Sequence, residues 1–193
     1  MLMDKKAMRR AGLAARRSLT PLERQDKSRS IQDALLESRV LSGAGNVFCY
    51  VSVEDEVHTA RLLSGILDAG KVLLVPYITD AKAGFMEAAQ LRQVEDLALG
   101  VYDIPTVPEE DKVFLAPEDI DVVIVPGSAF DTAGRRIGMG GGFYDRFVGK
   151  TSAVKVALAY DCQIFPRLPA EDYDKKVDMI FTESKIYTRE DMR

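Results

Sequence analysis

The stretch IDVVIVPG, residues 120–127, decides the fold class of this 193-residue chain. Its four consecutive aliphatic residues, Val122 to Val125, offer no polar side to solvent, which is typical of a strand covered on both faces. Helices must supply that cover, and the segments on either side of the strand contain them.

Short apolar segments alternate with helical patterns along the rest of the chain. Predicted strands are NVFCYVSV (46–53), KVLLVPYI (71–78), VKVALAYD (154–161) and DMIFTES (178–184), with GFMEAAQ (84–90) as a possible weak one. Predicted helices are 4–17, 21 to about 40, 58–70 and one from about 143, with a short helix or turn at 94–100. We expect one doubly wound α/β domain with a mostly parallel sheet and the two N-terminal helices packed outside it.

The helix ends carry specific signals. Thr20 is predicted as an N-cap, Pro21 suits the first helical position, and Glu23 completes a capping box. Gly70 is the expected stop of the helix that begins near His58. In the first helix we expect the apolar face to contain Met8, Ala11 and Ala15, with Lys and Arg on the rest.

Charge is distributed unevenly. The formal net charge is −4, which gives no general attraction for nucleic acid or a membrane. The first 17 residues nevertheless contain six of the 26 basic residues and only one of the 30 acidic ones, so the remaining chain has 20 basic and 29 acidic residues. Such a basic start is either part of a binding site or a mitochondrial transit peptide. No apolar run approaches the roughly 20 residues that span a bilayer.

The residue inventory excludes some kinds of site. His58 is the only histidine, so a multi-histidine metal site is excluded. Cys49 and Cys162 make no disulfide framework, and we expect both to be buried reduced thiols of a cytoplasmic protein. We expect a monomer, since no apolar surface stripe demands a partner.

The segment RRIGMGGGFYDR, residues 135–146, has four glycines in five positions. It is not a dinucleotide fingerprint, because Phe143 stands where the third glycine would be, and it is not a P-loop. Because glycines have no side chains, their backbone N–H groups can still converge on an anion at the start of a helix. Arg135 and Arg136 would add positive charge to such an anion site. The alternative is a tight turn, which explains one or two glycines but not four.

Carboxylates lie near this loop and at two other predicted strand ends. Asp145 either approaches an anion through Mg²⁺ or simply complements the helix dipole. Asp172, Asp174 or Asp178 is a candidate second metal ligand. The acidic residues 54–56 offer two alternatives. One of these carboxylates either caps the helix that follows or pairs with the cationic or amidine-like edge of a ligand ring.

Several segments taken together resemble the 5-formyltetrahydrofolate cyclo-ligase family, also called methenyltetrahydrofolate synthetases. They are residues 5–9, YVSVEDEVHT, VPYI with FME, VYDIPTVP, VPGSAFDTAGRRIGMGGGFYDRF and ALAYDCQIFPRLPAEDYDKKVDMIFTE. The resemblance spans nearly the whole chain and implies one three-layer α/β/α domain with the topology of the NagB, RpiA and CoA-transferase folds. It also implies conversion of 5-formyltetrahydrofolate and ATP to 5,10-methenyltetrahydrofolate, ADP and phosphate, with Mg²⁺.

By the same resemblance, two segments contact ATP: Lys5, Lys6, Ala7, Met8 and Arg9, and Arg136, Ile137, Gly138, Met139, Gly140, Gly141, Gly142, Phe143 and Tyr144. Lys5 and Arg136 would be the catalytic cations. Asp145 and Asp174 would hold Mg²⁺, with Asp178 as the alternative to Asp174. The folate pocket would contain Val51, Glu56, Met86 and Tyr144.

The chain departs from the family pattern at three positions. Some members have a basic residue at the position of Met139 and a lysine at that of Gly141, so other cations must supply that charge here. Asp103 replaces a usual glycine. The missing basic residues at 139 and 141 leave open a catalytically silent folate-binding protein of the same fold, and a phosphosugar isomerase or acyl-CoA transferase remains a rival within enzymes.

Overall fold

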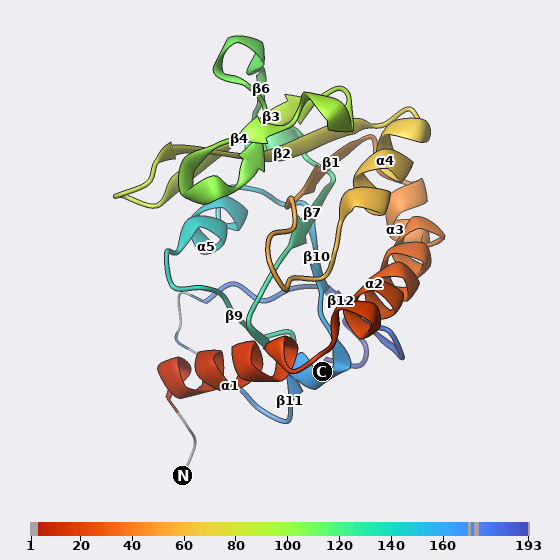
Figure 1. The fold of residues 1–193 in the computed structure, drawn as a ribbon, viewed down its shortest axis with the longest axis vertical. Helices are drawn as coiled ribbons and strands as arrows, with labels where there is room; N and C mark the ends of the chain where they lie inside the picture. The colour runs from red at the N-terminus through yellow and green to blue at the C-terminus, as the bar shows by residue number, and fades with distance from the viewer. Residues whose placement is uncertain (1–3, 170, 172–173, 193) are drawn as a thin grey trace.

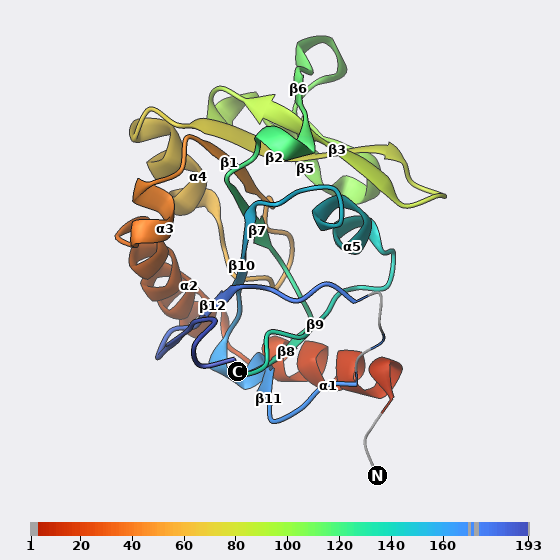
Figure 2. The same cartoon turned by 180° about the vertical axis from the view of Figure 1, so that it is seen from behind.

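The computed structural model describes residues 4–169, 171 and 174–192 (Figures 1 and 2). Within these residues the main sheet has eight strands in the order β13-β12-β10-β7-β1-β2-β3-β6. Their bounds are β1 Asn46–Cys49, β2 Val72–Asp80, β3 Phe85–Leu91, β6 Phe114–Leu115, β7 Val122–Val125, β10 Val154–Leu158, β12 Met179–Phe181 and β13 Ile186–Tyr187.

The other elements are short strands and helices. The strands are β4 Ala98–Leu99, β5 Pro105–Thr106, β8 Ala129–Asp131, β9 Arg136–Ile137 and β11 Ile164–Phe165. The α-helices are α1 Lys5–Arg17, α2 Pro21–Leu36, α3 Arg39–Ser42, α4 Ala60–Asp68 and α5 Phe143–Val148. Five 3₁₀ turns complete the described part: Val94–Asp96, Val101–Asp103, Glu109–Asp111, Pro117–Asp119 and Asp161–Gln163. Among these helices, none is both long and apolar enough to cross a membrane.

The predicted central strand is confirmed as β7. All four of its residues are buried, and it pairs in parallel with β1 on one side and β10 on the other. The β1–β2 and β10–β12 pairs are also parallel. Antiparallel pairing is confined to the edges, where β3 follows β2 as a hairpin and β13 follows β12. The weak strand expected at 84–90 is thus the well-formed strand β3, which lies between β2 and the short edge strand β6.

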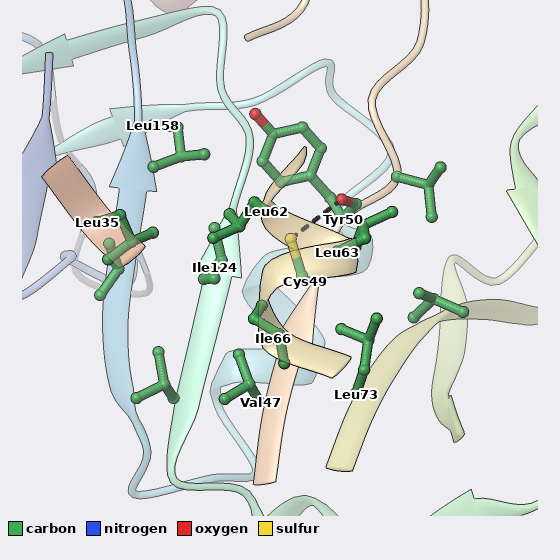
Figure 3. Packing of buried hydrophobic residues seen from close by; sticks show 14 of the residues in the cluster. Leu35, Val47, Cys49, Tyr50, Leu62, Leu63, Ile66, Leu73, Ile124 and Leu158 are labelled. Carbon is green, nitrogen blue, oxygen red and sulfur yellow. Dashed lines mark hydrogen bonds between the residues drawn. The ribbon is translucent and has the colours of Figure 1, made fainter. Parts of the chain in front are cut away.

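Helices cover both faces of the sheet, as predicted. On one face, α2 and α4 pack Leu35 and Ile66 onto strand residues such as Val47 and Ile124 (Figure 3). On the other face, Phe147 of α5 stacks on Phe48 with 4.6 Å between ring centroids. The result is a three-layer arrangement with one apolar cluster on each side of the sheet.

The helix-end signals are confirmed. Thr20 and Glu23 form the expected capping box at the start of α2, with Pro21 at its first position. Gly70 lies just beyond α4 with φ 71°, in the left-handed conformation that ends helices.

Several predicted elements are shorter than expected. The helix expected to reach about residue 40 ends at Leu36, and α3 continues separately. The strand expected over 46–53 ends at Cys49, because side chains then take over the backbone bonds: the Ser52 and Thr59 hydroxyls each accept from the other's backbone N–H, at 3.1 and 3.0 Å. Cys162 lies in a 3₁₀ turn and is only half-buried, so its predicted burial is wrong, while that of Cys49 is confirmed.

The helix α1 packs on a second, smaller sheet. Among the described residues this sheet has the order β11-β8-β9, and α1 lies beside it, away from α3 and α4 (Figures 1 and 2). The buried face of α1 is Met8, Gly12 and Arg16, so the predicted face was wrong beyond Met8. A Cβ at Gly12 would overlap the carbonyl oxygen of Ser128, which shows how closely the helix approaches β8.

Candidate active site

The N-terminal half of α1 is fixed against the strand that leads into the glycine loop, defined here as residues 138–142. Met8 packs with Ala129, Ile137 and Leu168 in a small apolar cluster. The predicted ATP residues Met8 and Ile137 are therefore core contacts that hold two site segments together. Basic residues at the start of the chain belong to this folded helix.

Arg9 joins α1 to the glycine loop directly. Its Nε donates to the carbonyl oxygen of Gly138 at 2.7 Å, although the two residues are 129 positions apart. The Arg9 guanidinium carbon also lies 3.6 Å from the place where a Cβ at Gly140 would be. The absence of a side chain at Gly140 thus lets a cation lie beside the loop. The structure brings together the two segments that the sequence predicted to share a site.

A second guanidinium, that of Arg146, fills the other side of the loop. Its Nη1 donates to the Gly141 carbonyl at 2.8 Å and to the Gly84 carbonyl at 3.5 Å, which ties the β2–β3 turn to the loop. Gly142 has φ 71°, and a Cβ there would overlap the same Nη1. Part of the glycine requirement therefore comes from the protein's own arginine. Arg146 was missed as a site residue from the sequence.

Arg136 is buried next to the loop. Its side chain is 4% exposed, and its Nη2 donates to Asp145 Oδ1 at 2.7 Å. Nη1 donates to the Pro126 carbonyl at 3.1 Å, and the guanidinium lies over the Tyr144 ring at 5.8 Å. Arg136 therefore fixes the geometry of the loop from within. Arg135, the other predicted cation, pairs instead with buried Asp131 at 3.1 Å.

The remaining predicted nucleotide residues differ in exposure. Lys6 is exposed, and the Ala7 amide donates to the Asp4 carboxylate that caps α1, at 2.6 Å. Met139 is 61% exposed, whereas Phe143 is half-buried. The helix that follows the loop, α5, has only six residues, so nearby arginines supply more positive charge here than its dipole does.

Lys5 meets the predicted metal ligand Asp174. Lys5 Nζ lies 2.7 Å from Asp174 and 2.9 Å from Glu171. Burial lowers the pKa of Lys5, but the hydrogen bonds and charges of the two carboxylates outweigh it and raise that pKa above its ordinary value. The ammonium group is therefore charged at neutral pH and belongs to the same side of the molecule as Arg9.

The predicted metal carboxylates are placed differently from one another. Asp145 pairs with Arg136 and its side chain is 38% exposed. Asp178 accepts from the Lys155 amide at 2.8 Å and pairs with Arg189, so it has a structural role. Asp172 lies outside the described residues. In the described part of the chain, no group of three or more His, Cys, Asp or Glu side chains is placed to hold a metal ion.

The loop after β1, residues 50–59, contains the predicted folate residues Val51 and Glu56. Glu56 Oε2 accepts from the Val53 amide at 3.1 Å, and burial raises the pKa of the Glu56 carboxyl. Burial, followed by the charge of Glu56, raises the pKa of Tyr144 well above its ordinary value. Tyr144 also packs against the apolar cluster that contains Tyr50 and Val51, so it lies beside the loop that contains Glu56.

Met86 lies on the other face of the sheet. It is 3% exposed and packs with Phe48 and Phe147 in the cluster beneath α5, while Val51 belongs to the cluster beneath α2 and α4. Tyr144 contacts both clusters. The structure does not bring Met86 and Val51 into one apolar wall.

An open cleft of about 370 Å³ lies at the carboxyl end of β2. It is lined by Tyr77 and Ile78, by residues of the β4–β5 segment such as Leu99, and by Glu109 in the 3₁₀ turn that follows β5. Tyr102 of that segment contacts Phe143 edge-on, with 6.4 Å between ring centroids. The β4–β5 segment beside the cleft is therefore joined by one aromatic pair to Phe143, the first residue after the glycine loop.

Comparison with known proteins identifies relatives of this chain. The model of the 5-formyltetrahydrofolate cyclo-ligase family matches residues 2–183. The 5-formyltetrahydrofolate cyclo-ligase of Escherichia coli K12 is 30% identical, over 89% of this chain and 96% of that protein. The mitochondrial 5-formyltetrahydrofolate cyclo-ligase of Arabidopsis thaliana is 29% identical, over 95% of this chain and 75% of its own length.

Solved structures agree with these matches. The NMR structure of Aquifex aeolicus 5,10-methenyltetrahydrofolate synthetase superposes with a TM-score of 0.87 at 30% identity, covering 99% of this chain and 95% of that one. The Mycoplasma pneumoniae 5,10-methenyltetrahydrofolate synthetase has a TM-score of 0.75 at 19% identity, covering 94% and 99%, which supports the fold.

Proposed function

This chain belongs to the 5-formyltetrahydrofolate cyclo-ligase family and has that family's ligase activity; from this premise we propose that α1 and the glycine loop form its ATP site. The reaction converts 5-formyltetrahydrofolate to 5,10-methenyltetrahydrofolate with ATP as co-substrate. The names of the relatives favour this active enzyme over a silent folate-binding protein of the same fold, and over an isomerase or transferase.

The observation that carries the ATP site is the Arg9 contact with the Gly138 carbonyl at 2.7 Å. It puts Lys5 and Arg9 of α1 on the side of a loop whose backbone is bare at Gly140 and Gly141. Bare backbone with cations beside it is the environment that phosphate groups need. We assign Lys5 to Arg9 and Arg136 to Tyr144 to the nucleotide on this basis.

The proposed chemistry has two steps. The γ-phosphoryl group moves from ATP to the formyl oxygen, so that a P–O bond forms as the bond to ADP breaks. N10 then attacks the formyl carbon, and phosphate leaves with that oxygen. Phosphoryl transfer needs positioning and neutralisation of negative charge, and we assign that work to Lys5 and, from within the loop, to Arg136.

The Mg²⁺ ion expected for this family fits the donor set. Mg²⁺ is usually held by one or two carboxylates together with phosphate oxygens, so a three-carboxylate cage is not required. We propose Asp145 as one ligand, supported by its half-exposed carboxylate, of which Arg136 engages Oδ1. Asp174 would become a ligand by exchanging its bond from Lys5 for the metal. The bound ion would add positive charge near the transferred phosphoryl group.

We propose that the folate ring lies against Val51, Glu56 and Tyr144. A partly buried carboxylate such as Glu56 suits the amidine-like edge of a pterin, because charge-assisted hydrogen bonds are strong where water is excluded. We do not place Met86 in contact with the folate ring, since it packs in the apolar cluster beneath α5. Tyr144 packs against the same cluster, so Met86 supports the folate site only through Tyr144.

Turnover is tested by following the absorbance of the methenyl product after the protein is mixed with 5-formyltetrahydrofolate, Mg²⁺ and ATP. We expect product only when ATP is present, with one ADP formed per product molecule. Binding of 5-formyltetrahydrofolate without formation of the methenyl product would contradict the proposal that the protein is an active ligase.

We also propose that the protein is a cytoplasmic monomer with reduced thiols at Cys49 and Cys162. Light scattering tests the oligomeric state, and cell fractionation tests the location.

A further inference from the structure

A buried ion pair joins the carboxyl end of α1 to the loop 50–59. Arg16 Nη2 donates to Asp55 Oδ1 at 2.7 Å, and the two side chains are 4% and 9% exposed. Arg17, which is exposed, adds a weaker contact to Asp55 Oδ2 at 3.4 Å. Neither Arg16 Nε nor Asp55 Oδ2 has a hydrogen-bond partner within the described residues, although both atoms are buried.

A buried ion pair of this kind contributes little net stability to the folded state. Removing two charged groups from water costs several kcal/mol per ion, and their attraction repays it only when the remaining polar atoms are satisfied. Here two of them are not satisfied. An apolar pair of similar size would hold α1 at least as well, so the charges point to another task.

That task is indicated by the neighbour of Asp55 in the chain. Glu56 follows directly, and its carboxylate bends back to accept from the Val53 amide at 3.1 Å. Tyr160 Oη donates to the Glu56 carbonyl at 3.1 Å, which fixes the backbone on the other side. Glu54, just before Asp55, has φ 49°, a strained conformation for a residue with a side chain. The ion pair is placed to hold this strained turn.

We infer that Arg16 is a positioning residue for folate recognition: through Asp55 it holds the turn that presents the Glu56 carboxylate to the substrate. This inference rests on the proposed function, in which Glu56 binds the folate ring. Because Lys5 and Arg9 lie on the same helix, α1 then supports both substrate sites, with the nucleotide at one end and the folate loop at the other.

Arg16 also acts on the charge state of Glu56. Burial raises the pKa of Glu56, the Val53 amide and the positive charge of Arg16 lower it, and the charges of Asp55 and Glu54 raise it. Tyr50 and Tyr144 also face this carboxylate, and both are neutral at physiological pH because burial raises their pKa values. Loss of the Arg16 charge should therefore raise the pKa of Glu56 further.

The test compares four variants of this chain: Arg16→Met, Arg16→Lys, Glu56→Gln and the double variant Arg16→Met with Glu56→Gln. Arg10→Met, at an exposed position of the same helix, is the matched control. We expect Arg16→Met to raise KM for 5-formyltetrahydrofolate about tenfold, with KM for ATP changed less than about twofold. Arg16→Lys should restore part of the loss, and Arg10→Met should behave as the wild type.

Two further readouts separate positioning from a merely structural role. The acid limb of kcat/KM for the folate should move to higher pH in Arg16→Met, and in the Glu56→Gln background the second substitution should add little. Equal increases in both KM values, or effects that multiply in the double variant, would overturn the inference. If Arg16→Met does not fold, Asp55→Asn is measured in the same way and judged by the same outcomes.

Failure of this inference is distinguishable from failure of the proposed function. Turnover by the wild type together with a raised folate KM in Glu56→Gln supports the proposed function. An unchanged KM in Arg16→Met then overturns the role of Arg16 alone. An unchanged KM in Glu56→Gln removes Glu56 from the folate site and overturns the inference with it, while absence of turnover in the wild type overturns the proposed function itself.

Discussion

Arg9 on α1 and Gly138, the first residue of the glycine loop, are joined by one hydrogen bond of 2.7 Å, from Nε to the carbonyl oxygen. This bond uses one edge of the guanidinium and leaves the charge beside a bare backbone. Gly140 has its open side toward the same guanidinium. The contact therefore both shapes the loop and places a cation where an anionic substrate is expected.

Arg9→Ala should weaken ATP binding much more than folate binding. The loss of one charged donor to a phosphate costs about 1.5–3 kcal/mol, so we expect KM for ATP to rise about tenfold or more. Steady-state kinetics with each substrate varied in turn measure this. Arg10→Ala, exposed on the same helix, controls for helix propensity and net charge. Equal effects of both variants would contradict the assignment.

Gly142→Ala should reduce stability and disturb the loop. Gly142 and Gly70 share the same φ of 71°, but a Cβ at Gly142 overlaps Arg146 whereas one at Gly70 has no atom within 4 Å. Gly70→Ala therefore measures the backbone strain by itself, about 1–2 kcal/mol. We expect Gly142→Ala to lose more, by urea denaturation, and to lose activity as well. A loss no larger than that of Gly70→Ala would show that Arg146 adjusts freely.

Asp145→Asn should raise the Mg²⁺ concentration that gives half-maximal activity. The substitution keeps the shape but removes a charged oxygen ligand; loss of a residue that merely orients a metal ligand already costs about 10–100-fold in metal affinity, so we expect at least that here. Activity is measured as Mg²⁺ is titrated at saturating ATP. Asp178→Asn is the control, because Asp178 holds the Lys155 amide and Arg189. The control should lower stability and leave the Mg²⁺ dependence unchanged; the reverse pattern would exchange the two roles.

The stability of the fold should depend on Asp55 in the acid range. Burial alone would raise the pKa of Asp55, but the hydrogen bond and charge of Arg16 outweigh it, so its folded pKa lies below the ordinary 3.8. A carboxyl group with a depressed pKa stabilises the folded state above its unfolded pKa, and this contribution is lost as pH falls through the folded pKa. Wild-type stability should therefore decline at pH values below about 4.

Asp55→Asn isolates this contribution. At pH 7 we expect a loss of about 3 kcal/mol in the free energy of unfolding, because Arg16 remains buried without its counter-ion. The difference from the wild type should shrink as both are measured at lower pH by chemical denaturation. A difference that is the same at pH 7 and in strong acid would mean that packing, not the ion pair, is responsible.

The layers of the fold could be predicted because each follows from local patterns. The run Val122 to Val125 has no polar side, so it becomes a central strand wherever helices are available to cover it. The capping box at Thr20 and the stop at Gly70 are also local, since each depends on bonds within a few residues. The resemblance of the motifs to one family was likewise visible without coordinates, and the family match confirms it.

The residues that connect distant segments could not be predicted with the same ease. Arg16 was not recognised because an arginine on a basic helix is normally exposed, although Met8, Gly12 and Arg16 do recur at the four-residue spacing of one helix face. Arg146 was missed because its partners, the carbonyls of Gly84 and Gly141, come from different parts of the chain. The face of the sheet on which Met86 packs could not be predicted either, since a strand's two faces cannot be told apart without its register.

The sequence by itself thus determined the layered α/β architecture, the helix ends marked by Thr20 and Gly70, and the family, because these depend on periodicity, local bonds and motif order. Only the tertiary structure decided which cations lie by the glycine loop, that Arg136 is buried beside it with Asp145, and that Arg16 reaches Asp55. The contacts of Arg9 and Arg16 arise when α1 packs on the small sheet of β11, β8 and β9. Packing geometry of that kind is set by the whole core and is not encoded in any single segment.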